Sequence, residues 1–204
     1  VPGVTFLLIL EQPNLSTAGS IMIVSLILII MAGAKWRHTL LMVAGGLTVG
    51  AYYAWSEPYR RRRLLSFRNP FAMMHDEGYQ LSQSLIAFGS GGVFGMGLGQ
   101  GRQKYAYLPY PESDFIFAIV GEDFGLLGCI VGIALFVALM IAGYRVAIAC
   151  RDKFGALLAA GITSSITVQA FLNMGVVVGI LPTPGLPLPF FSAGGPSVSI
   201  TMAA

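Results

Sequence analysis

The chain has 204 residues, of which 55% are hydrophobic and only 10% are charged, and its formal net charge is +3. Its mean hydropathy of +0.75 excludes a soluble globule, because so few charged residues cannot cover a surface that faces water. The composition predicts an integral membrane protein. No basic stripe is interleaved with aromatic residues, which argues against a nucleic-acid partner. Cys129 and Cys150 lie in or at the end of apolar segments and are expected to be small hydrophobic side chains.

Four apolar segments and the start of a fifth are expected to cross the bilayer as helices. The first two cover about residues 15–34 and 39–55, the fourth covers about 154–178, and the fifth begins near Ser197. Both ends of the chain interrupt this pattern, so we expect a fragment of a longer protein. The predicted fold class is an all-α polytopic integral membrane protein, with one long loop that carries short helices.

The third apolar segment is too long for one straight span. The 29 residues of 114–142 would form a helix of about 43 Å, whereas the hydrocarbon core is about 30 Å thick. The acidic pair Glu122-Asp123, followed by Gly125 and Gly128, offers a break. We therefore expect the span itself at about 125–144, a separate short helix at 114–121, and the acidic pair at the membrane interface or close behind the site.

The order of the spans sets the sides of the loops. The turns at 35–38 and 145–153 fall on one side, and the long loop 57–113 falls on the other with the turn 181–196. The short turns carry five Lys or Arg residues and the long loop carries seven. Because long loops obey the positive-inside rule poorly, the short turns decide, and the loop 57–113 is expected to be extracytoplasmic.

Asp114 is the candidate for chemistry. Residues 107–119 have the sequence Tyr-Leu-Pro-Tyr-Pro-Glu-Ser-Asp-Phe-Ile-Phe-Ala-Ile, which sets this carboxylate at the start of an apolar segment. A carboxylate at a membrane edge is costly unless it faces a polar cavity or a partner. The simpler alternative is a helix N-cap, in which the side chain accepts backbone amides without any catalysis.

The long loop begins Glu-Pro-Tyr-Arg-Arg-Arg-Arg at residues 57–63. Such a basic run beside a bilayer contacts lipid headgroups, or it binds the diphosphate of a polyprenyl-linked substrate, which suits the forked guanidinium group.

Further along, a helix is expected at 78–88, lying on the membrane or on other helices. One face of this helix is apolar, with Leu81, Leu85, Ile86 and Phe88. The opposite face is polar, with Gln80, Gln83 and Ser84.

Residues 89–101 contain seven glycines in 13 residues. The spacing does not match a dinucleotide-binding or Walker loop. A flexible connector is one interpretation, and a substrate groove lined by backbone amides is the other.

Within the fourth apolar segment, Gln169 and Asn173 lie four residues apart and are expected to hold neighbouring helices together.

Several of these segments resemble the SEDS family of shape, elongation, division and sporulation proteins, the FtsW, RodA and SpoVE type. Residues 108–118 resemble Leu-Pro-Glu-x-x-Thr-Asp-Phe-Ile-Phe-Ala, and residues 78–87 resemble Gly-Tyr-Gln-x-x-Gln-Ser-Leu-x-Ala. Residues 58–63 are similar to Pro-Tyr-Arg-x-x-Arg, and 179–197 resemble Gly-x-Leu-Pro-x-x-Gly-x-x-Leu-Pro-x-x-Ser-Tyr-Gly-Gly-Ser-Ser. The chain departs from the family pattern at Asn14, Ser16, Tyr110, Ala193 and Pro196.

The resemblance implies that residues 1–204 are the C-terminal half of a single SEDS membrane domain, with four to five helices of a fold that has roughly ten. It favours the division and sporulation branch. It also implies a peptidoglycan glycosyltransferase of the bacterial inner membrane, which polymerises lipid II during septal wall synthesis and releases undecaprenyl diphosphate. The expected partners are a class B penicillin-binding transpeptidase, other division proteins and membrane lipids.

The resemblance places the proposed catalytic general base at Asp114. The substrate-binding residues are expected to be Arg60, Arg63, Gln80, Gln83, Gln103, Lys104, Glu122 and Ser192. A divalent cation, Mg²⁺ or Mn²⁺, would help neutralise the diphosphate, although no acidic cluster in the chain specifies a metal site. Two alternatives stay open, which are a lipid II transporter without chemistry and a non-catalytic scaffold for division proteins.

Overall fold

The computed structural model describes residues 15–56, 61–62, 66–74, 78–101, 114–182 and 185–192. In these ranges the chain is helical and contains no strand, as the composition predicted. The elements are, in chain order, α2 (Leu15–Met31), α3 (Trp36–Ser56), the 3₁₀ helix η1 (Pro70–Met73), α5 (Tyr79–Gly91), α7 (Ile116–Ala149) and α8 (Lys153–Val177). The predicted start of a fifth span, near Ser197, lies outside the described residues.

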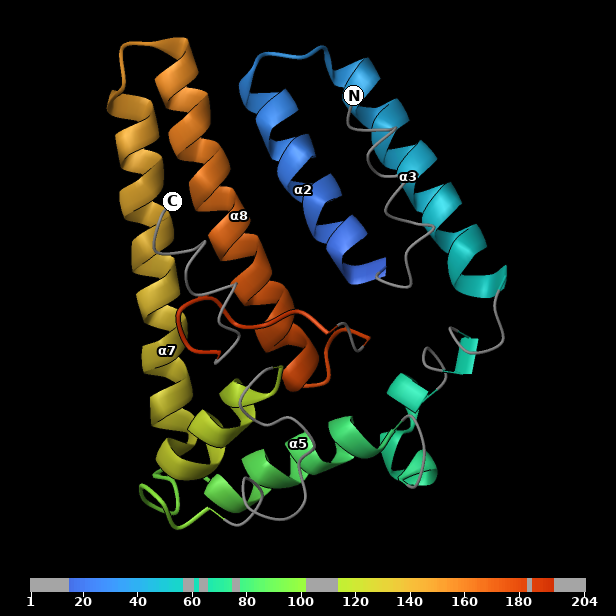
Figure 1. The fold of residues 1–204 in the computed structure, drawn as a ribbon, viewed down its shortest axis with the longest axis vertical. Helices are drawn as coiled ribbons and strands as arrows, with labels where there is room; N and C mark the ends of the chain where they lie inside the picture. Colours follow the sequence, from blue (N-terminus) through green and yellow to red (C-terminus); the bar gives the residue numbers. More distant parts are fainter. Residues whose placement is uncertain are drawn as a thin grey trace.

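Four long helices stand side by side, and a shorter helix lies across one end of them (Figure 1). α7 packs on α8, α8 packs on α2, and α2 packs on α3, while α5 packs on α7 and α8. The turns between α2 and α3 and between α7 and α8 lie at the same end of the molecule, and α5 lies at the opposite end. This arrangement agrees with the predicted sides of the loops.

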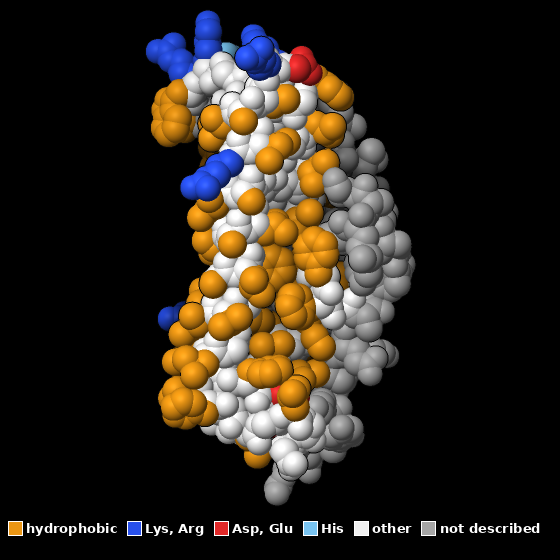
Figure 2. Space-filling view, turned by 90° about the vertical axis from the view of Figure 1, so that its left-hand side faces the viewer, with side chains coloured by type: hydrophobic (Ala, Val, Ile, Leu, Met, Phe, Trp, Pro, Cys, Tyr) orange, Lys and Arg blue, Asp and Glu red, His pale blue; other side chains and the backbone are white. Residues whose placement is uncertain are grey.

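The surface has the character of a membrane protein. Two of the described helices, Ile116–Ala149 and Lys153–Val177, are long and apolar enough to cross a bilayer, and Thr17–Met31 is a shorter apolar helix. Figure 2 shows apolar side chains over the lateral face and Lys and Arg side chains gathered at the end that carries the two turns. Four of the five basic residues counted for these turns lie at this end, Lys35, Arg37, Arg151 and Lys153, whereas Arg145 lies within α7.

α7 bends at Gly125, which has φ 67° and ψ −161° inside an otherwise helical segment. A break was predicted at Glu122-Asp123 and the glycines that follow, and the bend at Gly125 confirms it. The short helix before the bend begins at Ile116 and includes the acidic pair, so it is longer than the predicted 114–121. The span that follows, residues 125–149, is about 37 Å long at 1.5 Å per residue, which is enough to cross the hydrocarbon core.

The glycine-rich segment that follows α5 pairs with the bend in α7. The amides of Met96 and Gly97 donate to the carbonyls of Glu122 and Asp123, at 2.9 and 3.1 Å. On the far side of the bend, the amides of Leu126 and Leu127 donate to the carbonyls of Gly92 and Val93, at 2.9 and 3.3 Å. The segment therefore supplies the hydrogen bonds that the helix loses at the bend.

This pairing changes the interpretation of the glycines. They are not a loose connector, and two of the backbone amides proposed to line a substrate groove are occupied by α7. Small residues are required because the two backbones touch. A Cβ at Gly91 would overlap the Gly121 carbonyl, and Gly95 has φ 81° and packs against the Asp123 carbonyl.

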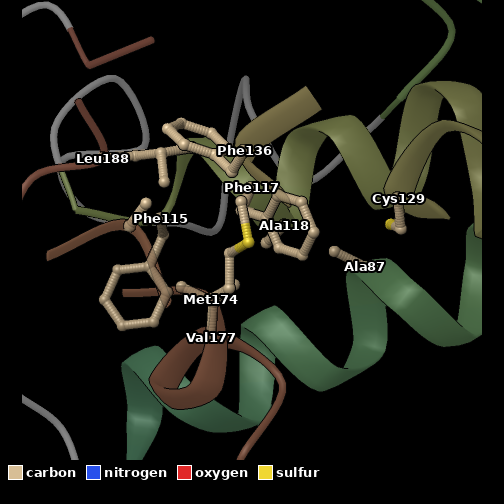
Figure 3. Packing of buried hydrophobic residues seen from close by; sticks show 10 residues of the cluster. Ala87, Phe115, Phe117, Ala118, Cys129, Phe136, Met174, Val177 and Leu188 are labelled. Carbon is tan, nitrogen blue, oxygen red and sulfur yellow. The ribbon is translucent and has the colours of Figure 1, made fainter. Parts of the chain in front are cut away.

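A buried hydrophobic cluster lies where α5, the start of α7 and the end of α8 meet (Figure 3). Phe115 and Phe117 are 4% and 2% exposed, and Leu188, from the segment after α8, is 1% exposed. The rings of Phe88 and Phe117 meet edge to face with centroids 6.1 Å apart. Because Phe115 directly follows Asp114, this cluster fixes the position of the candidate residue.

Replacing Gly125 with alanine is expected to destabilise the protein. The added Cβ would overlap Gly95 N, would lie 2.6 Å from Val93 O, and would occupy a left-handed backbone conformation. We expect a loss of about 2 kcal/mol or more in the free energy of unfolding. Thermal unfolding of the full-length protein in detergent measures it.

The matched control for that change is Gly132→Ala in the straight part of α7. The nearest atom to its Cβ would be a Phe117 ring carbon at 3.5 Å, an ordinary contact. The control should change stability by less than about 1 kcal/mol. Equal melting of both variants would contradict the assigned bend.

Candidate functional site

Asp114 lies in the turn before α7 and is half-buried. The N-cap position of α7 is Phe115, and no side-chain hydrogen bond is made at that cap within the described residues. The N-cap position thus falls one residue after Asp114, and both interpretations of its carboxylate, as general base and as a cap of backbone amides, stay predictions. The turn is anchored from behind by Phe115, so the carboxylate is held at the edge of the core rather than inside it.

The segment 185–192 folds back beside this turn. A Cβ at Gly185 would lie 3.2 Å from Asp114 Oδ2, so the backbone of Gly185 lies against the carboxylate. Asn173 Nδ2 donates to the carbonyl oxygens of Asp114 and Leu186, at 2.8 and 2.6 Å. Gln169 Nε2 donates to the carbonyl oxygen of Pro187 at 2.9 Å.

These bonds correct one expectation from the sequence. Gln169 and Asn173 lie on one face of α8, as their spacing predicted, but the bonds they make go to loop carbonyls and not to another helix. The reason is that residues 185–188 have no helical partners for their backbone groups, so side chains must supply them. Both amides therefore organise the site.

Ser192 closes the same segment. Its hydroxyl accepts the amide of Leu188 at 2.7 Å, and its own amide donates to the Leu188 carbonyl at 3.0 Å. The side chain is 1% exposed. The geometry thus gives Ser192 a structural contact, and its predicted role in substrate binding stays a prediction.

Glu122 and Asp123, which were expected at the membrane interface or close behind the site, are buried, at 1% and 6% exposed. A Cβ at Gly101 would lie 2.7 Å from both Glu122 Oε2 and Asp123 Oδ1, so the backbone of Gly101 covers the two carboxylates. The bend at Gly125 leads to this burial, because it brings the glycine-rich segment over the acidic pair. A small residue at position 101 is required for the same reason.

α5 is held against the end of α8. Ser84 Oγ donates to the Val177 carbonyl at 2.7 Å, and Phe88 packs on Phe117. Gln83 and Ser84, on the predicted polar face, are buried, and α5 packs on α7 and α8, which agrees with the predicted helix lying on other helices. Gln80 is half-buried on the same helix.

The arginine run is described only in part. The guanidinium carbon of Arg61 lies 6.0 Å from the centroid of the Trp55 ring at the end of α3, an arrangement typical of a membrane interface. Arg62 is exposed. Four of the predicted substrate-binding residues, Arg60, Arg63, Gln103 and Lys104, lie outside the described residues.

The structure therefore brings Asp114 together with a segment 71 or more residues away in sequence, at Gly185 to Leu186. Sequence reasoning identified Asp114 but missed Gly185 and the role of Asn173. The spacing of Gln169 and Asn173 was a signal for a shared polar face. No local pattern named their partners, since these lie in other segments.

Comparisons with known proteins agree with the motifs. A family model described as cell cycle protein, FtsW/RodA/SpoVE, matches residues 2–204. The chain is 42% identical over 202 residues to a protein of Geobacter sulfurreducens named probable peptidoglycan glycosyltransferase FtsW. This match covers 99% of the chain and 54% of that protein. It is 42% identical over 200 residues to stage V sporulation protein E of Bacillus subtilis, with 98% of this chain and 54% of that protein covered.

Two solved structures have a similar fold. One, described as "Structural coordination of polymerization and crosslinking by a peptidoglycan synthase complex", has a TM-score of 0.78 and 27% identity, and the match covers 100% of this chain and 58% of that chain. The other is a mutant of the Thermus thermophilus rod shape determining protein RodA, with a TM-score of 0.63, 24% identity and coverage of 99% and 52%. This chain spans about half the length of the relatives it matches.

Replacing Ser192 with alanine is expected to loosen the segment beside Asp114. The buried amide of Leu188 would lose its acceptor, which costs about 1–3 kcal/mol locally. Hydrogen exchange should therefore accelerate in residues 186–192 of the full-length protein, with no change in α7. The control is Ser90→Ala, because among the described residues the Ser90 hydroxyl donates to the Ala87 carbonyl of its own helix. Unchanged exchange in Ser192→Ala would contradict the assigned contact.

Proposed function

Because the chain belongs to the FtsW/RodA/SpoVE family of cell cycle proteins, we propose that the protein of which it forms about half is a peptidoglycan glycosyltransferase. It would polymerise lipid II into glycan strands during septal wall synthesis. The observation that carries the proposal is Asp114, a half-buried carboxylate at the position where the family's proposed base falls, set against the backbone of Gly185.

The chemistry needs one base at the acceptor sugar. Asp114 would accept the proton of the acceptor hydroxyl as its oxygen attacks the anomeric carbon of the donor and the bond to the diphosphate breaks. Undecaprenyl diphosphate then leaves. The turn that carries Asp114 is anchored by Phe115 in the buried cluster, and the backbone of Gly185 lies against the carboxylate, which would restrict its movement before the substrate binds. Such pre-organisation lowers the cost of reaching the transition state.

Arg60 and Arg63 of the basic run 60–63 would bind the diphosphate. Forked guanidinium groups suit the bidentate recognition of phosphate, and Arg61 beside Trp55 supports a location at the membrane interface, where a lipid-linked diphosphate lies.

A divalent cation, Mg²⁺ or Mn²⁺, would enter with the substrate. The described residues contain no group of three or more His, Cys, Asp or Glu side chains that could hold a metal ion.

The basic turns set the orientation that we propose. Lys35, Arg37, Arg151 and Lys153 lie at the end opposite α5, so that end would face the cytoplasm and Asp114 would face the outer surface of the bacterial inner membrane. The loop 57–113 would then be extracytoplasmic. The structural relative is a complex described as coordinating polymerisation and crosslinking, which supports a class B penicillin-binding transpeptidase as partner.

A transporter of lipid II is the second candidate. A lipid-linked diphosphate needs arginines and interrupted helices in both cases, and the bend in α7 fits either. The two functions differ at Asp114, because catalysis requires its carboxylate and transport does not. A scaffold would be indifferent to both Asp114 and the arginines.

Replacing Asp114 with asparagine is expected to abolish polymerisation. Loss of the base should lower the rate at least 100-fold, as is typical of general-base catalysis, which contributes about 10²- to 10⁴-fold. The assay measures glycan polymer from purified lipid II with the full-length protein and its transpeptidase partner. The control is Asp152→Asn at the opposite end of the molecule, where asparagine can still accept the Gly155 amide.

Three outcomes separate the candidates. Polymer from the wild type and the control, but not from Asp114→Asn, supports the glycosyltransferase. Equal polymer from all three removes Asp114 as the base. No polymer from any of them, with lipid II binding intact, favours transport or scaffolding.

Replacing Arg60 and Arg63 together with glutamine is expected to weaken substrate binding. If these side chains bind the diphosphate, KM for lipid II should rise about 10-fold or more, since each charge-assisted bond contributes about 1.5–3 kcal/mol. The matched control replaces Arg61 and Arg62, which removes the same charge from the same run. Equal effects of both pairs would instead favour general attraction to lipid headgroups.

A further inference from the structure

Asn173 joins two segments that are far apart in the chain. Its side chain is 2% exposed, and its Nδ2 donates both to the carbonyl oxygen of Asp114, 59 positions away, and to that of Leu186, 13 positions away. One amide group thus sets the turn before α7 relative to the segment after α8. Its Oδ1 is buried with no hydrogen-bond partner within the described residues, so donation by Nδ2 is the contact that the side chain makes.

The chemistry of the site requires an amide at this position. Both neighbours are carbonyl oxygens, so only a group with two N–H bonds can serve both of them. A carboxylate would repel both oxygens, and an aliphatic side chain of the same size would leave two buried acceptors unsatisfied. The nitrogen is assigned to this side of the amide by its two neighbours.

The joined segment touches the carboxylate directly. Gly185 precedes the Leu186 carbonyl that Asn173 holds, and its backbone lies against Asp114 Oδ2. The rest of the segment is fixed by the bond from Gln169 to Pro187 and by the burial of Leu188 in the cluster with Phe115. A change at Asn173 is therefore transmitted to the carboxylate along two routes, through the Asp114 backbone and through Gly185.

We propose that Asn173 is a positioning residue, which holds the Asp114 carboxylate against Gly185 and directs it toward the acceptor hydroxyl. This inference rests on the proposed function. Asn173 does not touch the substrate, so its loss should reduce the rate of the chemical step and leave substrate binding unchanged. A displacement of about 1 Å at a reacting group lowers a rate by up to about 100-fold.

The test compares Asn173→Leu with wild type in the full-length protein and its transpeptidase partner, with lipid II as substrate. Leucine keeps the volume and removes both donors. We expect kcat to fall about 10- to 100-fold, with KM within about threefold and the same amount of folded protein. The control is Thr167→Val, a buried change on the same helix, because in the part of the chain that the structure describes the Thr167 hydroxyl donates to carbonyls of α8 itself. The control should keep kcat within about threefold.

Gly185→Ala provides an independent variant. Its methyl group would lie 3.2 Å from Asp114 Oδ2, so the carboxylate must shift by a few tenths of an ångström. The same fall in kcat with unchanged KM is expected, and this variant decides the question if Asn173→Leu does not fold.

The inference is overturned if folded Asn173→Leu keeps the wild-type kcat, or if this variant changes KM alone. If Asn173→Leu does not fold, a wild-type kcat in Gly185→Ala overturns it. Polymer from wild type together with one of these results would reject the positioning role alone. No polymer from wild type would reject the proposed function, and the positioning role with it.

Discussion

The structure depends on one constraint, which is that backbone groups at a membrane boundary must find partners within the protein. Inside lipid no water replaces a lost helical hydrogen bond. The chain breaks its helices in two places near α5, at Gly125 and after α8. In the first place the glycine-rich segment supplies backbone amides and carbonyls to α7, and in the second the side chains of Asn173 and Gln169 supply donors.

The segment after α8 lies directly beside Asp114, and the bend at Gly125 orients the short helix that follows Asp114. Because α7 bends at Gly125, the short helix that follows Asp114 has a different direction from the membrane span. The hydrogen bonds to the glycine-rich segment stabilise this bend. The segment after α8 then packs Leu188 beside Phe115 and sets Gly185 against the carboxylate. The candidate polar site therefore lies at the end of an apolar bundle, where the interrupted helices leave backbone groups without helical partners.

Hydropathy and length were sufficient to predict the helices and the bend, because an apolar segment of 29 residues cannot cross a bilayer straight. Asp114 was recognised for the same reason, since a charge at a membrane edge is costly. The partners of Asn173 and the burial of Glu122 and Asp123 were not predictable. Each depends on a contact between segments distant in the chain, and the sequence around each residue is the same whether or not that contact forms.

The most direct test is a structure of the full-length protein with a bound lipid II acceptor analogue. The account predicts that the acceptor hydroxyl lies about 3 Å from a carboxylate oxygen of Asp114, with Asn173 still bonded to the carbonyl oxygens of Asp114 and Leu186. An acceptor sugar bound away from Asp114, with the carboxylate directed into the protein, would contradict it.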